Sequence, residues 1–177
     1  MLFAGGELGV VGDNQHGQLG LAIKHDKTMT LEEQNTVKAL TLVTIKDFVD
    51  NDLIINDIAA GTEHTMFITQ PKKYDALEAK TEERQVWTIG DGRMNGKRDA
   101  LDSPNPSLIE LDMDPQDRIM YIYSAYHRCA VMDSNNCLHL WGTNSYDPFI
   151  FHQFDPSHMI KRLAMSDHHG LALDDRG

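Results

Sequence analysis

Residues 58–69 read IAAGTEHTMFIT: a short apolar run, a glycine, two variable residues, a histidine and a second apolar run. The same line returns as YIYSAYHRCAVM at residues 121–132 and as LAMSDHHGLALD at residues 163–174. Its histidines, His64, His127 and His169, lie 63 and 42 residues apart. Repetition on this scale decides the architecture, because each copy is one unit of a repeated fold.

A second line alternates with the first. It reads VVGDNQHGQLG at residues 10–20, VWTIGDG at residues 86–92 and LHLWGTN at residues 138–144. Its glycines, Gly12, Gly90 and Gly142, are spaced by 78 and 52 residues. Strand-like runs that recur about every 40–50 residues are typical of a β-propeller with four strands per blade.

The longer spacings between equivalent repeat residues require insertions, which fall at residues 23–56 and 70–85. In the first, TLEE at residues 30–33 predicts a capping-box start to a short helix. The second is polar and permits a helix. It is predicted to be a long solvated loop, with a partner-binding arm as the alternative.

We therefore predict an all-β fold, a partial β-propeller of about three blades of four-stranded antiparallel sheets with helical or loop insertions. One domain spans residues 1–177, in repeat pieces of about 1–56, 57–118, 119–159 and 160–177. Three blades are fewer than the roughly four of the smallest common propeller and leave open edges. Three explanations stay open: the chain is a fragment, another chain completes it within a larger assembly, or it associates with itself.

The tract GDNQHGQLG at residues 12–20, with AGTEHT at 60–65 and LWGTN at 140–144, resembles the signature of the regulator of chromosome condensation (RCC1) repeat family. The copies are degenerate, since Ser124 and Ser166 replace the glycine that precedes the histidine. The resemblance implies a propeller, usually of seven blades, in which the repeat histidine is structural. The predicted structural repeat residues are Gly12, Gly17, Gly20, Gly61, His64, Gly90, His127, Trp141, Gly142 and His169.

Composition excludes several function classes. The net charge of −11, from 16 basic and 27 acidic residues, disfavours binding to nucleic acid or chromatin. No apolar run approaches the roughly 20 residues of a membrane span. Two cysteines do not make a disulfide scaffold and favour a reducing compartment. We expect a cytoplasmic or cytoskeletal location, with the nucleus as an alternative.

No catalytic motif is found. Residues 12–17 have the glycine spacing of a phosphate-binding loop, but Gln18 and Leu19 follow instead of lysine and serine or threonine. Neither a Gly-x-Ser-x-Gly elbow nor a His-Glu-x-x-His helix is present. We predict no catalytic residue, metal ligand or cofactor, and hence no enzyme. Histidines at equivalent positions of successive blades would be too far apart to share one ion.

Two residue pairs are assigned to packing. Trp87 and Trp141 are predicted to pack within blades, with a surface anchor for a partner as the alternative. Cys129 and Cys137 are predicted to be free packed thiols, with Cys129 opposite Leu140 on the neighbouring strand.

Loops on a rigid strand framework suit recognition. The predicted function is therefore a non-catalytic protein-interaction or scaffold subunit, whose partners are other protein chains, including one that would complete the propeller. The alternative, implied by the resemblance, is a guanine-nucleotide exchange factor for a small GTPase that uses residues 93–98 as a wedge. The interaction candidates are Asp13, Asn14, Gln15, His16, Lys72, Lys73, Tyr74, Arg84, Arg93, Lys97 and Arg98.

Overall fold

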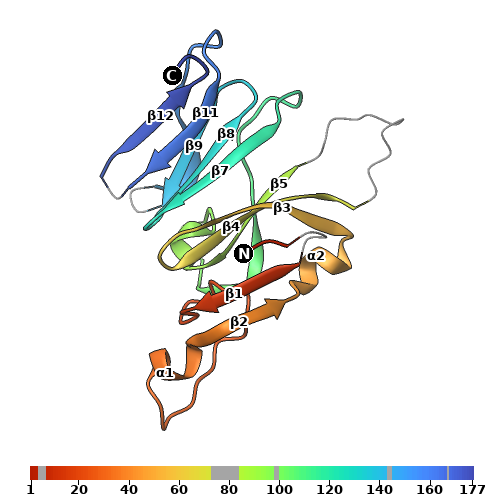
Figure 1. Cartoon of the computed structure of the whole chain (residues 1–177), viewed down its shortest axis with the longest axis vertical. Helices are drawn as coiled ribbons and strands as arrows, with labels where there is room; N and C mark the ends of the chain where they lie inside the picture. The colour runs from red at the N-terminus through yellow and green to blue at the C-terminus, as the bar shows by residue number, and fades with distance from the viewer. Residues whose placement is uncertain (4–6, 73–83, 98–99, 143–144, 167) are drawn as a thin grey trace.

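A computed structural model of the chain describes residues 1–3, 7–72, 84–97, 100–142, 145–166 and 168–177. Its main elements are antiparallel sheets that stack one after another along the molecule (Figure 1). The elements are β1 (Leu8–Gly12), α1 (Leu31–Asn35), β2 (Val37–Val43), α2 (Lys46–Asp50), β3 (Leu53–Ala60), β4 (His64–Pro71), β5 (Gln85–Gly90), η1 (Gly92–Met94), β6 (Ser103–Ile109), β7 (Ile119–Ala125), β8 (Arg128–Asp133), β9 (Cys137–Gly142), β10 (Ser145–Gln153), β11 (Ile160–Met165) and β12 (Gly170–Asp174).

Two of the sheets are complete propeller blades. Strands β3–β6 form the first complete blade and β7–β10 the second, each pairing its strands in chain order. The N-terminal half-blade, β1–β2, and the C-terminal half-blade, β11–β12, flank them as two-stranded sheets. This arrangement confirms the predicted partial all-β propeller. The predicted repeat boundary after residue 56 falls inside β3, which begins at Leu53.

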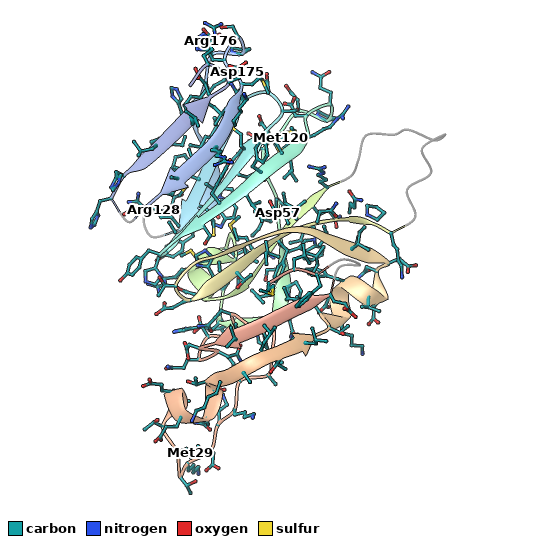
Figure 2. All side chains as sticks on the ribbon, in the orientation of Figure 1. Met29, Asp57, Met120, Arg128, Asp175 and Arg176 are labelled. Carbon is teal, nitrogen blue, oxygen red and sulfur yellow. The ribbon has the colours of Figure 1, made fainter. Side chains whose placement is uncertain are left out.

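Apolar side chains fill the space between neighbouring sheets (Figure 2). One cluster joins the two complete blades through residues such as Met66, Val131 and Trp141. A second cluster joins the N-terminal half-blade to the first complete blade, and a third joins the second complete blade to the C-terminal half-blade. Each of these interfaces buries apolar surface, which stabilises the stacking of neighbouring sheets by roughly 25 cal/mol per Å².

The glycine-to-histidine spacing of the first repeat line has a steric cause. Residues 61–64 form the turn between β3 and β4, closed by the Gly61 amide donating to the His64 carbonyl at 2.9 Å. A Cβ placed on Gly61 would lie 2.1 Å from the His64 ring. Glycine therefore makes room for the imidazole, whose Nε2 bonds to Ser124 Oγ of the next blade at 2.7 Å.

The hairpin registers correct the sequence alignment by one residue. Ala125 pairs with Arg128 in the second complete blade, as Gly61 faces His64 in the first. Arg128 therefore occupies the position of His64, and His127 occupies the position of Glu63. The third copy keeps the predicted histidine, since the Ser166 amide donates to the His169 carbonyl. The expectation that His127 is a counterpart of His64 was wrong, because Ala125 rather than Ser124 takes the place of Gly61 before the two-residue turn of the second blade.

The cysteine pairing also differs by one residue from expectation. Asn136 adopts a φ of 64°, so the β8–β9 turn pairs Met132 with Leu138. Cys129 consequently lies opposite Trp141 rather than Leu140. Both cysteines are buried and free, as predicted.

The first insertion folds as expected at its start. Thr30 caps α1, and Glu33 returns a hydrogen bond to the Thr30 backbone, which completes the predicted capping box. Helix α2 follows, and its Phe48 packs edge-on against Phe67 and Trp87. Both helices have five residues, and none among the described residues is long and apolar enough to cross a membrane.

Candidate functional site: a charged cluster between blades

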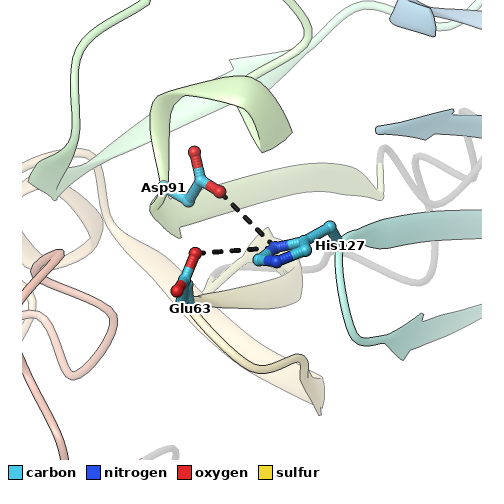
Figure 3. A group of neighbouring side chains, drawn as sticks. All are labelled: Glu63, Asp91 and His127. Atoms are coloured by element: carbon cyan, nitrogen blue, oxygen red, sulfur yellow. Dashed lines mark ion pairs between the residues drawn. The ribbon is translucent and has the colours of Figure 1, made fainter. Parts of the chain in front are cut away.

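Loops from successive blades meet at the end of the sheets that carries the β3–β4 and β7–β8 turns, here called the rim. Glu63 lies in the first of these turns, His127 lies in the second, and Asp91 directly follows β5. Figure 3 shows the three side chains converging from separate loops. Their ligand-type atoms lie within 4.8 Å of one another. With Arg93, His16 and Asp102, these residues form what we call the rim cluster.

Arg93 is the cation at the centre of this cluster. Its Nη2 atom lies 2.5 Å from Asp91 Oδ2 and 3.1 Å from Glu63 Oε2. His127 Nδ1 faces the same two carboxylate oxygens at 3.6 Å each. Burial acts to raise the pKa of Asp91, but the hydrogen bonds and charge of Arg93 outweigh it and hold that pKa below its ordinary value. The Asp91 carboxylate therefore stays ionised and paired.

The loop after β1 joins the same network. His16 Nδ1 lies 2.6 Å from Asp102 Oδ2, and His16 Nε2 lies 3.5 Å from Glu63 Oε1. Asp102 also accepts a hydrogen bond from the Gly92 amide at 2.9 Å. The rim cluster thus connects the N-terminal half-blade to both complete blades.

The cluster has the residue types of a metal site, but its geometry favours an ion-pair network. A carboxylate pair with a histidine would suit a divalent transition metal. Arg93 already bridges both carboxylates, so a metal ion would have to displace its guanidinium. The Arg93–Glu63 pair, with side-chain exposures of 46% and 27%, is worth about 1 kcal/mol or less. It fixes the relative positions of two loops rather than provides much stability.

Backbone and side-chain hydrogen bonds make the rim a continuous structure. The Thr62 amide donates to the Tyr126 carbonyl at 3.1 Å, and Trp141 Nε1 donates to the Met94 carbonyl at 2.8 Å. Both bonds cross between the complete blades. The Thr65 hydroxyl donates to the Gln18 carbonyl at 2.7 Å, across to the N-terminal half-blade.

The predicted interaction residues divide between two ends of the sheets. His16 and Arg93 belong to the rim cluster, and Lys97 is exposed in the loop between Asp91 and Asp102. Asp13 and Gln15 lie in the same loop as His16. Asn14 of this loop is buried and holds it in place, because its side chain accepts a hydrogen bond from the Leu19 amide and donates one to the Leu21 carbonyl. Lys72 and Arg84 lie at the opposite end, where Arg84 donates to the Ile119 carbonyl. Lys73, Tyr74 and Arg98 lie outside the described residues.

Sequence reasoning did not nominate Glu63, Asp91 or Asp102. A weak signal existed, since Asp91 follows Gly90 as Asp13 follows Gly12, at the end of equivalent strands. Both glycines have positive φ angles, 104° and 113°. A carboxylate after this glycine is therefore directed to the same rim in both blades.

The buried thiols do not have the environment of a nucleophile. Cys129 is fully buried, and burial raises the pKa of its thiol well above the ordinary value. Nucleophilic cysteines require the opposite shift, towards the thiolate. Cys129 is accordingly a packing residue of the core between the complete blades.

Comparison with solved structures identifies the fold. Human WBSCR16 superposes with a TM-score of 0.69 at 15% identity, over 99% of this chain and 42% of its own. The chain has an RCC1-like fold. Prp20p from Saccharomyces cerevisiae, described with its binding properties to Gsp1p and histones, matches at 0.64 and 19%, over 94% of this chain and 39% of its own.

Yeast RCC1 (Prp20) bound to Kap60 also matches, with a TM-score of 0.64 at 15% identity over 99% of this chain and 39% of that one. This RCC1-like chain therefore spans about two fifths of the length of the solved structures it matches. No family model and no curated protein matches its sequence. At these identities, the likeness shows the RCC1-like fold alone.

Proposed function

We propose that this chain is a non-catalytic protein-interaction module that presents the rim to a protein partner. The observation that carries the proposal is the rim cluster, in which acidic, basic and histidine side chains from three sheets meet. Partly exposed side chains on a fixed framework bind with little loss of conformational entropy. The RCC1-like neighbours support protein partners, since Prp20p is described with Gsp1p and histones and yeast RCC1 with Kap60.

A pair of matched charge reversals tests this proposal. Lys97 is an exposed lysine in the loop between Asp91 and Asp102 of the rim cluster, and Lys72 is an exposed lysine at the opposite end of the sheets. Lys97→Glu and Lys72→Glu change the net charge equally. Tagged variants are used to capture partners from the source organism, and co-purifying chains are quantified by mass spectrometry.

Loss of a specific partner from Lys97→Glu, with retention by Lys72→Glu, is the expected result. Gln15→Lys on the same rim should weaken the same association. Equal recovery of every partner by all three variants would refute the rim as the binding surface. Circular dichroism of each variant checks that the strands are intact.

A second candidate function is nucleotide exchange on a small GTPase, which the RCC1-like fold and the Gsp1p binding of Prp20p suggest. Exchange requires only that the factor bind the nucleotide-free state more tightly. In the nominated wedge, Met94 and Asn95 are buried, so only Arg93 and Lys97 among the described residues extend outwards. Fluorescent-nucleotide release from a small GTPase, unchanged by an excess of this protein, would refute this function.

A further inference from the structure

A groove, here called the basal groove, lies at the end of the sheets opposite the rim. Its volume is about 280 Å³. Its walls come from the start of β5, the end of β6, the loop of residues 110–118 and the start of β7. These segments belong to the two complete blades or to the connection between them (Figure 1). The basal groove is therefore built without either half-blade.

Most of the side chains that line the basal groove are apolar. Val86, Ile109 and Ile119 line it and belong to the buried cluster between the complete blades. Leu111 and Met113 line it from the loop, and both are only partly buried. Apolar surface that stays open to water in a concave place is typical of an interaction site.

The size of the basal groove favours protein side chains over a cofactor as its occupant. Its volume of about 280 Å³ is below the roughly 300–1,000 Å³ of typical small-molecule sites. It is well above the roughly 150 Å³ of a cavity that binds benzene. Leu108, which also lines the groove, is 39% exposed and extends its apolar surface outwards. The groove therefore has room for apolar side chains of a bound segment.

Hydrogen bonds hold the walls of the basal groove in place. The Ser134 amide donates to the Arg118 carbonyl at 2.8 Å, and the Arg118 amide donates to Ser134 Oγ at 2.9 Å. These bonds tie the loop to the end of β8. Arg84 at the start of β5 donates to the Ile119 carbonyl at 3.2 Å. A preformed groove binds with a small cost in conformational entropy.

Acidic side chains alternate with the apolar ones along the loop. Residues 110–114 read ELDMD, in which Leu111 and Met113 are partly buried whereas Glu110, Asp112 and Asp114 are exposed. Within the part of the chain that the structure describes, none of these three carboxylates forms an ion pair. They are therefore available to the cations of a partner.

The charge balance of the basal groove is negative. Asp117 adds a fourth carboxylate, whereas Arg84 and Arg118 are the basic residues of its walls. Four acidic and two basic side chains give a local charge of −2, of the same sign as the −11 of the whole chain. Such a field attracts basic partners and repels acidic ones.

We propose that the basal groove docks a basic segment of a second protein. An apolar side chain of that segment enters the groove, and lysine or arginine residues on either side of it face Glu110, Asp112 and Asp114. The groove and the rim lie at opposite ends of the complete blades. The chain therefore has a docking surface that is separate from the rim and independent of the function proposed for it.

The test begins with peptides of unbiased sequence. A display library of random short peptides is selected on the full chain at low salt, where exposed charges are least screened. The selected peptides should carry lysine or arginine on both sides of isoleucine, leucine, methionine or phenylalanine. Replacing those apolar residues by serine should weaken binding roughly tenfold or more, measured by fluorescence anisotropy. An empty selection, peptides without this pattern or equal binding of the serine peptide would overturn the proposal.

Matched charge reversals place the selected peptide on the molecule. Glu110→Lys should weaken its binding roughly fivefold or more, whereas Glu32→Lys, on α1 and far from the loop between β6 and β7 (Figure 1), should leave it unchanged. Leu108→Ser should weaken it as well. Equal effects of Glu110→Lys and Glu32→Lys would overturn the proposal, because net charge alone would explain the binding. Loss of the peptide from Lys97→Glu, with retention by Glu110→Lys, would also overturn it, since the peptide would then bind the rim. Urea unfolding checks that each variant is folded.

Discussion

Acidification should destabilise the fold through one buried histidine. His64 is 1% exposed, and its Nε2 bonds to Ser124 Oγ of the next blade. Burial lowers the pKa of His64 to about 4, although the nearby Asp91 charge acts in the opposite direction. The imidazole is therefore neutral in the folded chain across the physiological range.

The size and sign of this loss of stability follow from the difference in proton binding between the folded and unfolded states. The unfolded His64 titrates near 6.5 and the folded one near 4, so between these values the unfolded state binds more protons. The stability contributed by the neutral ring is fully present above pH 6.5 and is lost as the pH falls towards 4. At about 1.4 kcal/mol for each pKa unit, the upper limit of the loss is roughly 3 kcal/mol. That is a large part of the roughly 5–15 kcal/mol that stabilises a typical domain.

The assay is urea unfolding at pH 7.5 and at pH 4.5, followed by tryptophan fluorescence. His64→Gln removes the titrating group and should reduce the loss of unfolding free energy between the two pH values by about 2–3 kcal/mol. His25→Gln makes the same exchange at an exposed position and should leave the loss unchanged. Identical pH dependence in the wild type and His64→Gln would refute the reasoning.

Three further outcomes are expected. Gly142→Ala, at a φ of 127° with its new Cβ 2.2 Å from a backbone oxygen, should lower the free energy of unfolding by about 3 kcal/mol in urea titrations. Gly96→Ala, at a φ of 66° with its new Cβ no closer than 3.2 Å to the Ile109 side chain, should cost only about 1 kcal/mol in the same assay. Trp141→Phe leaves the buried Met94 carbonyl unpaired and should cost about 2 kcal/mol by thermal unfolding, whereas no loss would show that water replaces the indole. Cys129 should resist a thiol reagent in the folded chain and react in urea, and rapid native labelling would contradict its burial.

The architecture could be predicted because it depends on short-range patterns. Alternating apolar runs separated by glycine turns determine strands within one repeat, and residues 30–33 contain a complete local helix start. The alignment error at His127 came from matching Ser124 with Gly61, because the turns of both complete blades hold two residues and Ala125 takes the place of Gly61. Cys129 was displaced for a different reason, since the β8–β9 turn, with its left-handed Asn136, is one residue longer than expected.

The rim cluster could not be predicted, because its contacts join distant segments. His16 and Asp102 are separated by 86 residues, and Arg93 and Glu63 by 30. Each residue alone reads as an ordinary polar loop residue. Their proximity arises from the stacking of blades, which the sequence pattern indicates only in outline.

Glu63 and His127 occupy equivalent turn positions, so the two complete blades differ where they meet. The same turn position carries a glutamate in one blade and a histidine in the next, and the two side chains meet across the interface at 3.6 Å. A tandem duplication of the second complete blade would set histidine against histidine and lose this contact between a carboxylate and an imidazole. The order of the two complete blades is therefore marked by this pair of side chains, which duplicated blades would lack until one of them changed at this position.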